Sequence, residues 1–221
     1  MMARKIRGKR ARRVVSDAEK AIGKVARAAM ECRDCDIWAR ATQTVFGEGN
    51  ANADVMFVGE QPGNKEDVIG RPFVGPAGQL FDRALDEAGI DRKQVYVTNA
   101  VKHFNSTQRG KLRIHKKPNA TEIAACRRWL DREISIIRPK IIVCLGATAA
   151  QALLGAKFKV TEQRGKFFES PLAPLVTATV HPSSILRVGD QNSRQEQKRQ
   201  FVEDLKKIAH HLPASSKRRK A

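Results

Sequence analysis

VMFVGEQPG, residues 55–63, joins an apolar run to a glycine-rich turn. Its first four residues form a continuous apolar run, which is typical of a strand buried on both faces of a parallel sheet. The turn GEQPG that follows places a carboxylate between glycines, and glycines let a backbone approach a ligand closely. We therefore predict a central strand that ends in a glycine-rich turn, which either binds a ligand or is merely a turn.

Similar apolar runs recur along the chain, and helical patterns separate them. Strands are predicted at 55–58, 95–97, 141–145 and 175–180, with a further candidate edge strand at 165–169. Helices are predicted at 17–31, 76–88, 122–137, 148–154 and 191–212. Strands that alternate with helices indicate a three-layer α/β/α fold with a central, mainly parallel four-stranded sheet.

Composition predicts one domain and a polyanionic partner. The 221 residues suffice for a single domain with a full core, and 42 Lys and Arg against 23 Asp and Glu give a net charge of +19. Without the eleven basic residues at the two ends, 31 basic residues still face 23 acidic ones. Nucleic acid is the leading partner, although tails that serve only solubility are an alternative. The expected division is a basic, disordered arm at 1–15, one domain at 16–212 and a basic tail at 213–221.

The termini and cysteines bear on the compartment. The sequence has no run of 18 apolar residues, so no membrane span is expected. The N-terminus lacks the apolar region of a secretory signal; it is Arg-rich, as a transit peptide or a basic arm would be. We expect a cytoplasmic, DNA-associated protein whose four cysteines are thiols or metal ligands rather than disulfides.

Polar residues follow the predicted strands at the edge where the carboxyl ends of a parallel sheet meet. They are Glu60 after the first strand, Asn99 after the second and His181 after the last. Ligands of open α/β sheets bind at this edge. The turn at 59–63 matches neither a Walker A loop, since no Gly-Lys-Ser/Thr follows, nor GxGxxG. A nucleoside triphosphatase or a dinucleotide enzyme is therefore poorly supported.

GKLRIHKKPN, residues 110–119, is interpreted as part of a long polar loop over 102–120. It shows neither the alternation of a strand nor the period of a helix. One histidine, His115, stands among its basic residues. By itself this imidazole is either an ordinary DNA-contacting side chain or a nucleophile.

Five motifs in this order resemble the uracil-DNA glycosylase superfamily. They span about residues 30–190 and are the CxxC before the first strand, GEQPG…GRPFVGPAG, YVTNAVK, Cys126 and HPSSILR. The resemblance is closest to the iron–sulfur, family 4-like branch. GKLRIHKKP resembles the histidine-bearing loop of the UdgX type, whose members excise uracil and then stay covalently attached to the abasic DNA.

The resemblance implies a role for each residue of the predicted pocket. His115 would attack C1′, Glu60 would stabilise the cation or accept a proton, and His181 would donate to uracil O2, where charge develops. Asn99 would pair with N3–H and O4 of uracil, a pattern that cytosine reverses, and Phe73 would stack on the base. The other implied pocket residues are Gly59, Gln61 and Gly63.

DNA contacts are expected on both sides of this pocket. Leu186 is a candidate wedge for the vacated stack, and the basic neighbours of His115 are expected to hold phosphate. The implied set is Lys111, Arg113, Lys116, Ser183, Ser184, Leu186 and Arg187. Uracil-containing DNA, preferably single-stranded, is the expected partner of a monomeric protein.

Cys32 and Cys35 form a CxxC pair that suits a redox pair, a zinc half-site or an iron–sulfur half-site. The position after a helix does not give the βαβ setting of a thioredoxin-like pair. The resemblance implies a 4Fe–4S cluster held by Cys32, Cys35, His103 and Cys126. His103 stands where the iron–sulfur branch has a cysteine, and histidine can replace cysteine as an iron ligand. Cys144 is the alternate fourth ligand, and zinc is the competing metal.

The predicted function is therefore DNA repair by uracil excision, with covalent attachment of His115 to C1′ of the abasic site. An ordinary multiple-turnover uracil-DNA glycosylase and a non-catalytic uracil-DNA binding protein are the alternatives. Free uracil and an SDS-stable protein–DNA band, measured in one assay, separate the three.

Overall fold

The computed structural model describes residues 15–212, so the predicted tails at 1–15 and 213–221 lie outside the described residues apart from Val15. None of the described helices is long and apolar enough to cross a membrane. The elements in chain order are α1 (Asp17–Met30), η1 (Asp36–Ala39), β1 (Glu48–Gly49), β2 (Val55–Gly59), α2 (Asn64–Ile69), α3 (Pro76–Glu87), η2 (Arg92–Gln94), β3 (Tyr96–Asn99), β4 (Ser106–Arg109), β5 (Leu112–His115), α4 (Ala120–Ile137), β6 (Ile141–Leu145), α5 (Ala147–Leu154), α6 (Val160–Gln163), β7 (Phe167–Ser170), β8 (Ala173–Thr179), α7 (Pro182–Leu186) and α8 (Gln191–His210).

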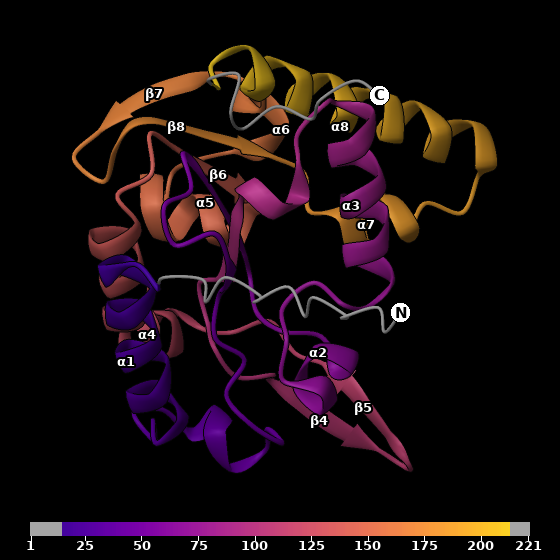
Figure 1. Ribbon diagram of the computed structural model, residues 1–221. Helices are drawn as coiled ribbons and strands as arrows, with labels where there is room; N and C mark the ends of the chain where they lie inside the picture. Colours follow the sequence, from indigo (N-terminus) through magenta and orange to yellow (C-terminus); the bar gives the residue numbers. More distant parts are fainter. Residues whose placement is uncertain (1–14, 213–221) are drawn as a thin grey trace, which may run out of the picture.

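A six-stranded sheet runs through the domain in the order β1-β3-β2-β6-β8-β7 (Figure 1). Strands β3, β2, β6 and β8 pair in parallel. Strands β1 and β7 extend the two edges in antiparallel pairing. The predicted α/β fold is confirmed, and the four predicted strands form the parallel centre. The predicted strand number is too low because β1 has two residues and carries no sequence pattern.

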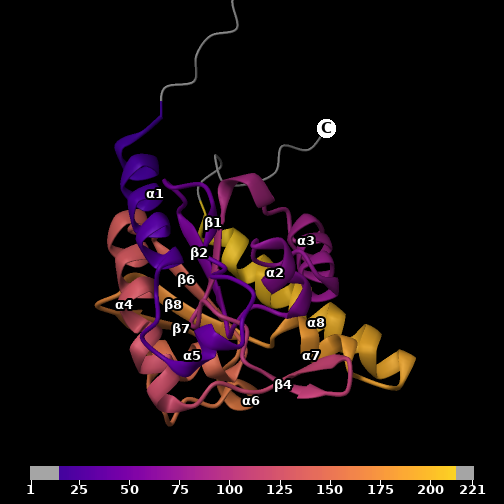
Figure 2. The ribbon, with the colours of Figure 1, turned by 90° about the horizontal axis from the view of Figure 1, so that it is seen from below.

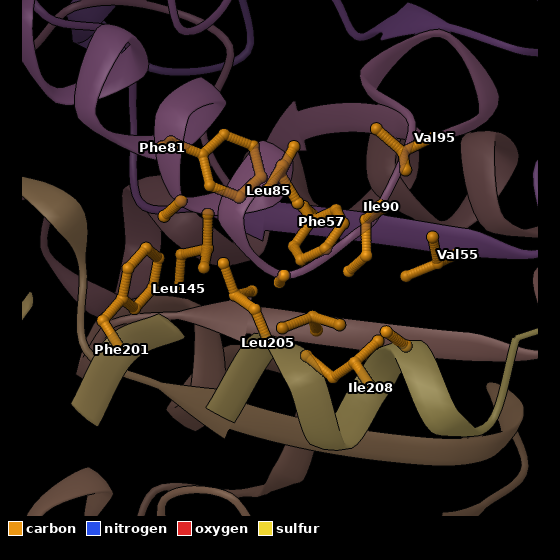
Figure 3. Close-up of a cluster of buried hydrophobic side chains, with 14 of the residues drawn as sticks. Val55, Phe57, Phe81, Leu85, Ile90, Val95, Leu145, Phe201, Leu205 and Ile208 are labelled. Carbon is orange, nitrogen blue, oxygen red and sulfur yellow. The ribbon is translucent and has the colours of Figure 1, made fainter. Parts of the chain in front are cut away.

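Helices α3, α7 and α8 cover one face of the sheet (Figures 1 and 2). Figure 3 shows the core on this side, where Phe57 of β2 and Leu145 of β6 meet Phe81 of α3 and Phe201 and Leu205 of α8. All five side chains are fully buried. Each such side chain stabilises the fold by roughly 1.5–3 kcal/mol. The apolar runs of the strands therefore fix the sheet from this face.

Helices α4 and α5 cover the other face, and α1 packs on α4 (Figure 1). Leu130 and Ile134 of α4 lie against Met56 of β2 and Ile142 of β6. A smaller cluster joins α1 to α4 and includes Trp129. The strands are thus buried on both faces, as their continuous apolar runs predict.

Strands β4 and β5 form a separate two-stranded hairpin, so the prediction of a loop over 102–120 is wrong. The hairpin extends from the domain beside α2 (Figure 1). Gly110, with φ of 58°, makes its tight turn. Leu112 and Ile114 are exposed and alternate with Arg113 and His115. This alternation of period two is a strand signal, and it explains why the segment pairs.

Other differences from the predicted elements are small. Helix α4 begins at Ala120, because Asn119 accepts the Glu122 amide at 2.9 Å and completes a capping box. Helices α2, α6 and α7 are additions to the predicted set. They have 6, 4 and 5 residues, too few to show a helical period.

Candidate active site

The carboxyl ends of the parallel strands bring the predicted polar residues to one edge, which we call the sheet rim. It contains Gly59 at the end of β2 and Glu60 directly after it, Asn99 at the end of β3, Thr148 after β6 and His181 after β8. The chain passes from β2 to β3 on one side of β2 and later crosses from β3 to β6 on its other side, so the rim lies at a topological switch point. Two surface hollows, of about 680 and 840 Å³, lie elsewhere, and neither is lined by Glu60, Asn99 or His181.

Gly59 is the floor of the rim. A Cβ atom at this position would lie 2.3 Å from Asn99 Oδ1 and 2.9 Å from Phe73 Cζ. The Phe73 ring is buried and its centroid lies 6.2 Å from that of His181, with 29° between the ring planes. The Asn99 carboxamide, the Phe73 ring and the His181 imidazole thus lie around the backbone of Gly59, which has no side chain. This arrangement suits a flat, polar ring such as a nucleobase.

Phe73 occupies a left-handed backbone conformation, with φ of 57°. Such a conformation is a genuine outlier for a bulky residue and is kept only where the surroundings impose it. Gly78 of α3 leaves room for this backbone, since a Cβ at Gly78 would lie 1.7 Å from the Phe73 carbonyl oxygen. The strained backbone therefore belongs to the residue whose aromatic ring faces the sheet rim.

His181 is a neutral hydrogen-bond donor. Its Nδ1 accepts the backbone N–H of Ser183 at 3.1 Å, so the proton of the neutral ring is on Nε2. Burial lowers the pKa of His181 to about 4. At neutral pH the ring can thus donate from Nε2 without carrying charge, as predicted for a group that faces a developing anion.

Glu60 is held from two sides. The Thr148 hydroxyl donates to Oε2, and His115 Nε2 lies 3.1 Å from Oε1. Burial alone would raise the pKa of Glu60, but the hydrogen bonds from His115 and Thr148 outweigh it and leave the pKa below its ordinary value. The carboxylate is therefore charged at neutral pH. Thr148 is a residue that sequence reasoning missed, although it follows a predicted strand at the same rim.

His115 reaches the rim from outside the sheet. It is the last residue of β5, and its side chain is 51% exposed. The Phe104 ring lies beside it, with 6.3 Å between the ring centroids. Three predicted catalytic residues, Glu60, His115 and His181, are thus brought together, because Glu60 interacts with both imidazoles.

Gln61 does not line the base site, which corrects the prediction. It is buried, and its Nε2 donates to the carbonyls of Asn105 and Lys116, each at 3.2 Å. Its Oε1 accepts the Asn105 amide at 3.1 Å. Gln61 therefore joins the two ends of the hairpin that carries His115. Gly63, also predicted for the pocket, is the N-cap of α2.

Arg113 is turned toward the protein, so the prediction that it faces phosphate is also corrected. Its Nη1 donates to Asp67 Oδ2 at 2.5 Å and its Nε to Asn64 Oδ1 at 2.9 Å. Asp67 is fully buried on α2. This bond ties the middle of β5 to α2. Lys111 and Lys116 are exposed on the same hairpin.

The residues of the last motif lie on α7 next to His181. Ser184 Oγ donates to the His181 carbonyl at 2.7 Å, and Arg187 Nη1 donates to Ser183 Oγ at 3.1 Å. Leu186 is 37% exposed. The serines therefore hold the histidine turn, while Leu186 and Arg187 remain at the surface.

Three of the four free cysteines gather between α1 and α4. Cys32, Cys35 and Cys126 belong to one apolar cluster. Trp129 Nε1 donates to Cys32 Sγ at 3.1 Å, and the Lys102 amide to Cys126 Sγ at 3.2 Å. Burial raises the pKa of Cys126 to about 12. Within residues 15–212, no three His, Cys, Asp or Glu side chains are arranged around a single metal position.

His103 is buried and its Nε2 lies 2.8 Å from Thr44 Oγ1. Thr44 donates its own hydroxyl hydrogen to the Ala29 carbonyl at 3.0 Å, so it can only accept from the imidazole. The proton of His103 is therefore on Nε2, and Nδ1 carries the lone pair. Cys144, the alternate ligand, belongs to a different core cluster under β6, apart from the other three thiols.

Comparisons with known proteins agree with this geometry. A family model described as the uracil DNA glycosylase superfamily matches residues 46–206. A type-4 uracil-DNA glycosylase of Thermotoga maritima is 40% identical over 178 residues, which cover 80% of this chain and 87% of that protein. Those of Sulfurisphaera tokodaii (39%, 74% of each chain) and Archaeoglobus fulgidus (36%, 83% and 89%) are also similar. The chain thus belongs to the uracil-DNA glycosylase superfamily.

Proposed function

We propose that this protein excises uracil from DNA and then stays attached through a bond between His115 and C1′ of the abasic site, as in the UdgX type. The observation that carries the proposal is the 3.1 Å contact between His115 Nε2 and Glu60 Oε1 at the sheet rim. The imidazole is half exposed there, so a DNA sugar can approach it.

The rim residues account for recognition of the base. The Asn99 carboxamide, beside Gly59, would accept from N3–H and donate to O4 of uracil. Cytosine reverses this pattern and would leave buried polar groups unpaired, which disfavours its binding. The Phe73 ring would stack on the base once it has left the helix.

The same residues account for bond cleavage and capture. As the C1′–N1 bond breaks, its electron pair would leave with uracil, and Nε2–H of His181 would stabilise the charge on O2. Glu60 would stabilise the positive charge on the sugar. A ring nitrogen of His115 would then bond to C1′ in place of water, and the proton lost by the imidazole would pass to Glu60.

The cysteine group fits a 4Fe–4S cluster, which the resemblance to the iron–sulfur branch implies. Hydrogen bonds from Trp129 and the Lys102 amide are directed at two of the sulfurs, as is common where sulfur carries negative charge. Cys32, Cys35 and Cys126 would be ligands, and His103 would use Nδ1 while Nε2 bonds Thr44, the usual arrangement of a ligating histidine. When bound, the cluster would link α1 to the segment that leads to His115.

Zinc is the weaker alternative at this position. All zinc ligands must reach one ion at about 2.0–2.3 Å. In an iron–sulfur cluster each protein ligand binds its own iron, so the sulfurs lie further apart. Equal amounts of iron and acid-labile sulfide, with a visible absorption that bleaches on reduction, are expected. A colourless protein loaded with zinc would contradict the cluster.

The surface around the rim supports DNA as the substrate. Lys111 and Lys116 on the hairpin and Arg187 on α7 are exposed and would contact phosphate. Leu186 would fill the space that the base leaves. We propose that a monomer acts, with single strands preferred because their bases need no unpairing.

The test is an incubation of the full chain with uracil-containing DNA, single- and double-stranded. We expect free uracil and a protein–DNA band that survives SDS and heat. His115→Ala should lose the band, while His211→Ala, distant in sequence, should keep it. Uracil release without the band would leave an ordinary multiple-turnover glycosylase. Binding without uracil release would leave a non-catalytic binding protein.

A further inference from the structure

A fully buried ion pair lies behind Asn99. Lys102 Nζ and Glu133 Oε2 are 2.5 Å apart, and neither side chain has exposed area. Removing two charges from water costs free energy, so a buried pair is weak evidence of stability by itself. A pair in contact with a candidate recognition residue therefore points to a functional reason for its presence.

The Lys102 ammonium completes the hydrogen bonding of β3 where the edge strand stops. It donates to the backbone carbonyl of Asn99 at 2.7 Å and to Thr98 Oγ1 at 2.6 Å. In the described part of the chain, β1 pairs with Tyr96 and Val97 and goes no further along β3. The buried carbonyl of Asn99 thus has an ammonium where a longer strand would supply an amide.

Glu133 fixes the ammonium from α4. Its Oε1 accepts from Tyr96 Oη at 2.9 Å and from the Gly47 amide at 3.1 Å. The Thr98 hydroxyl lies 3.0 Å from both carboxylate oxygens. The carboxylate therefore has several donors in fixed positions, and Lys102 has little freedom to move.

We propose that Lys102, held by Glu133, is a positioning residue that fixes the orientation in which Asn99 reads uracil. The inference rests on the proposed role of Asn99 in base recognition. A carboxamide distinguishes uracil from cytosine by which of its ends, C=O or NH₂, faces each base atom. The Asn99 side chain lies beside Gly59, while the backbone carbonyl of Asn99 accepts a hydrogen bond from Lys102 Nζ. Loss of that bond frees the peptide that orients the carboxamide.

The same lysine joins the rim to the cysteine group. Its backbone amide donates to Cys126 Sγ at 3.2 Å, and its side chain binds Glu133. Cys126 and Glu133 are seven residues apart on α4, so they lie on the same face of the helix. Helix α4 thus contacts both the backbone amide and the side chain of Lys102. A structural change at the cysteines can therefore alter the position of Asn99 through Lys102.

The experiment uses Lys102→Met, Glu133→Gln and the double variant in the full chain. Lys102→Met alone leaves a buried carboxylate unpaired, whereas the double variant removes both charges and keeps an amide for Tyr96 and Thr98. Lys140→Met, which removes the exposed lysine of the ion pair with the partly buried Asp54 (2.9 Å), is the matched control. The readouts are the unfolding temperature, the inhibition constant of free uracil and the ratio of excision rates for uracil and cytosine.

We expect the double variant to unfold close to the wild-type temperature, yet to bind free uracil about tenfold more weakly and to discriminate less against cytosine. Wild-type inhibition by uracil in the double variant would overturn the proposal. The proposal would also be overturned if uracil binding and discrimination against cytosine fell only in proportion to the unfolding temperature across all variants. Such a result would indicate that the ion pair has a purely structural role.

A second comparison is made in an Asn99→Ala background. Lys102→Met should add little further loss there, since it acts through Asn99. If the two losses multiply, Lys102 acts independently of Asn99 and the proposal is wrong. A wild-type protein that releases no uracil would refute the proposed function instead, and direct titration with free uracil would still test Lys102.

Discussion

The ends of β3 and β5 carry two side chains for which we propose a function, and the surroundings of these side chains differ. Asn99 is 3% exposed, lies in the central sheet and is supported by the buried pair Lys102–Glu133. His115 is half exposed and lies on a hairpin outside that sheet, which the side chains of Gln61 and Arg113 attach. Recognition of the base would thus belong to the core, whereas covalent capture would belong to a peripheral element.

This contrast implies that the two steps can be separated by mutation. Changes at the sheet rim should lower uracil release and adduct formation together. Changes at the attachments of the hairpin should instead shift the product from the adduct toward free abasic DNA, because water replaces a misplaced imidazole. The ratio of adduct to free abasic DNA therefore measures whether recognition and capture depend on different parts of the protein.

The largest effect is expected at the floor of the rim. Gly59→Ala would place a Cβ 2.3 Å from Asn99 Oδ1, so the carboxamide must move. Uracil release and adduct formation should both fall, by on the order of 100-fold, as assayed by single-turnover kinetics. Gly23→Ala on α1, where a Cβ meets Arg27 only at 3.6 Å, is the control and should keep full activity. An active Gly59→Ala protein would show that the floor is not where the base binds.

A smaller and more selective effect is expected at the contact between α2 and the hairpin. Asp67→Asn removes the charge that holds Arg113 while preserving shape. The adduct should form about tenfold more slowly, because displacing a reacting group by about 1 Å is costly, and total uracil release should change little. Glu48→Gln breaks the exposed pair with Arg71 and is the matched control. Equal losses of adduct and uracil release would contradict the separation of the two steps.

Substitution of Gln61 should also lower adduct formation relative to uracil release, but less than Asp67→Asn does. Gln61→Met deletes its bonds to Asn105 and Lys116 and leaves the buried Asn105 amide without the Gln61 acceptor, at a cost of about 1–3 kcal/mol of unfolding free energy. The adduct-to-abasic ratio should fall several-fold. Hydrogen exchange should show faster opening of the Asn105 amide, and unchanged exchange there would argue against the role of Gln61.

The smallest effect is on the pH dependence of stability. The pKa of His181 falls from its ordinary 6.5 to about 4 on folding because of burial. The unfolded chain therefore takes up this proton first, and the contribution to stability is complete above pH 6.5 and is lost as pH falls toward 4. His181→Gln should flatten the unfolding temperature over that interval. A slope that is the same in both proteins would mean that His181 stays accessible to protons.

The sheet was predictable because its strands are buried on both faces. Phe57 and Val143 lie within continuous apolar runs, which define strands without any knowledge of their neighbours. The hairpin was not predicted, because β4 is polar and exposed and β5 has four residues. Leu112 and Ile114, alternating with Arg113 and His115, were the signal that could have identified it.

The residues of the candidate site also fall into a group that the sequence predicts and a group that it does not. Glu60, Asn99 and His181 were predictable because they follow strands whose ends must meet at one edge. Thr148 and Asp67, which hold Glu60 and Arg113, act across 88 and 46 residues of sequence and belong to no local pattern. Gln61 was placed in the pocket by its position in GEQPG, since a sequence motif does not tell which way a side chain turns.

The hairpin is its own two-stranded sheet, and side-chain hydrogen bonds attach it to the rest of the domain. Gln61 and Arg113 make several of them, Asn105 donates to Glu122 at 3.1 Å, and His115 contacts Glu60. Because these bonds come from few side chains, we expect the hairpin to be transferable. Moving residues 105–116 into a related glycosylase, together with a glutamine and an aspartate at the positions of Gln61 and Asp67, should carry the capture chemistry across. Such a chimera would convert a recycling enzyme into a single-use label for uracil in DNA.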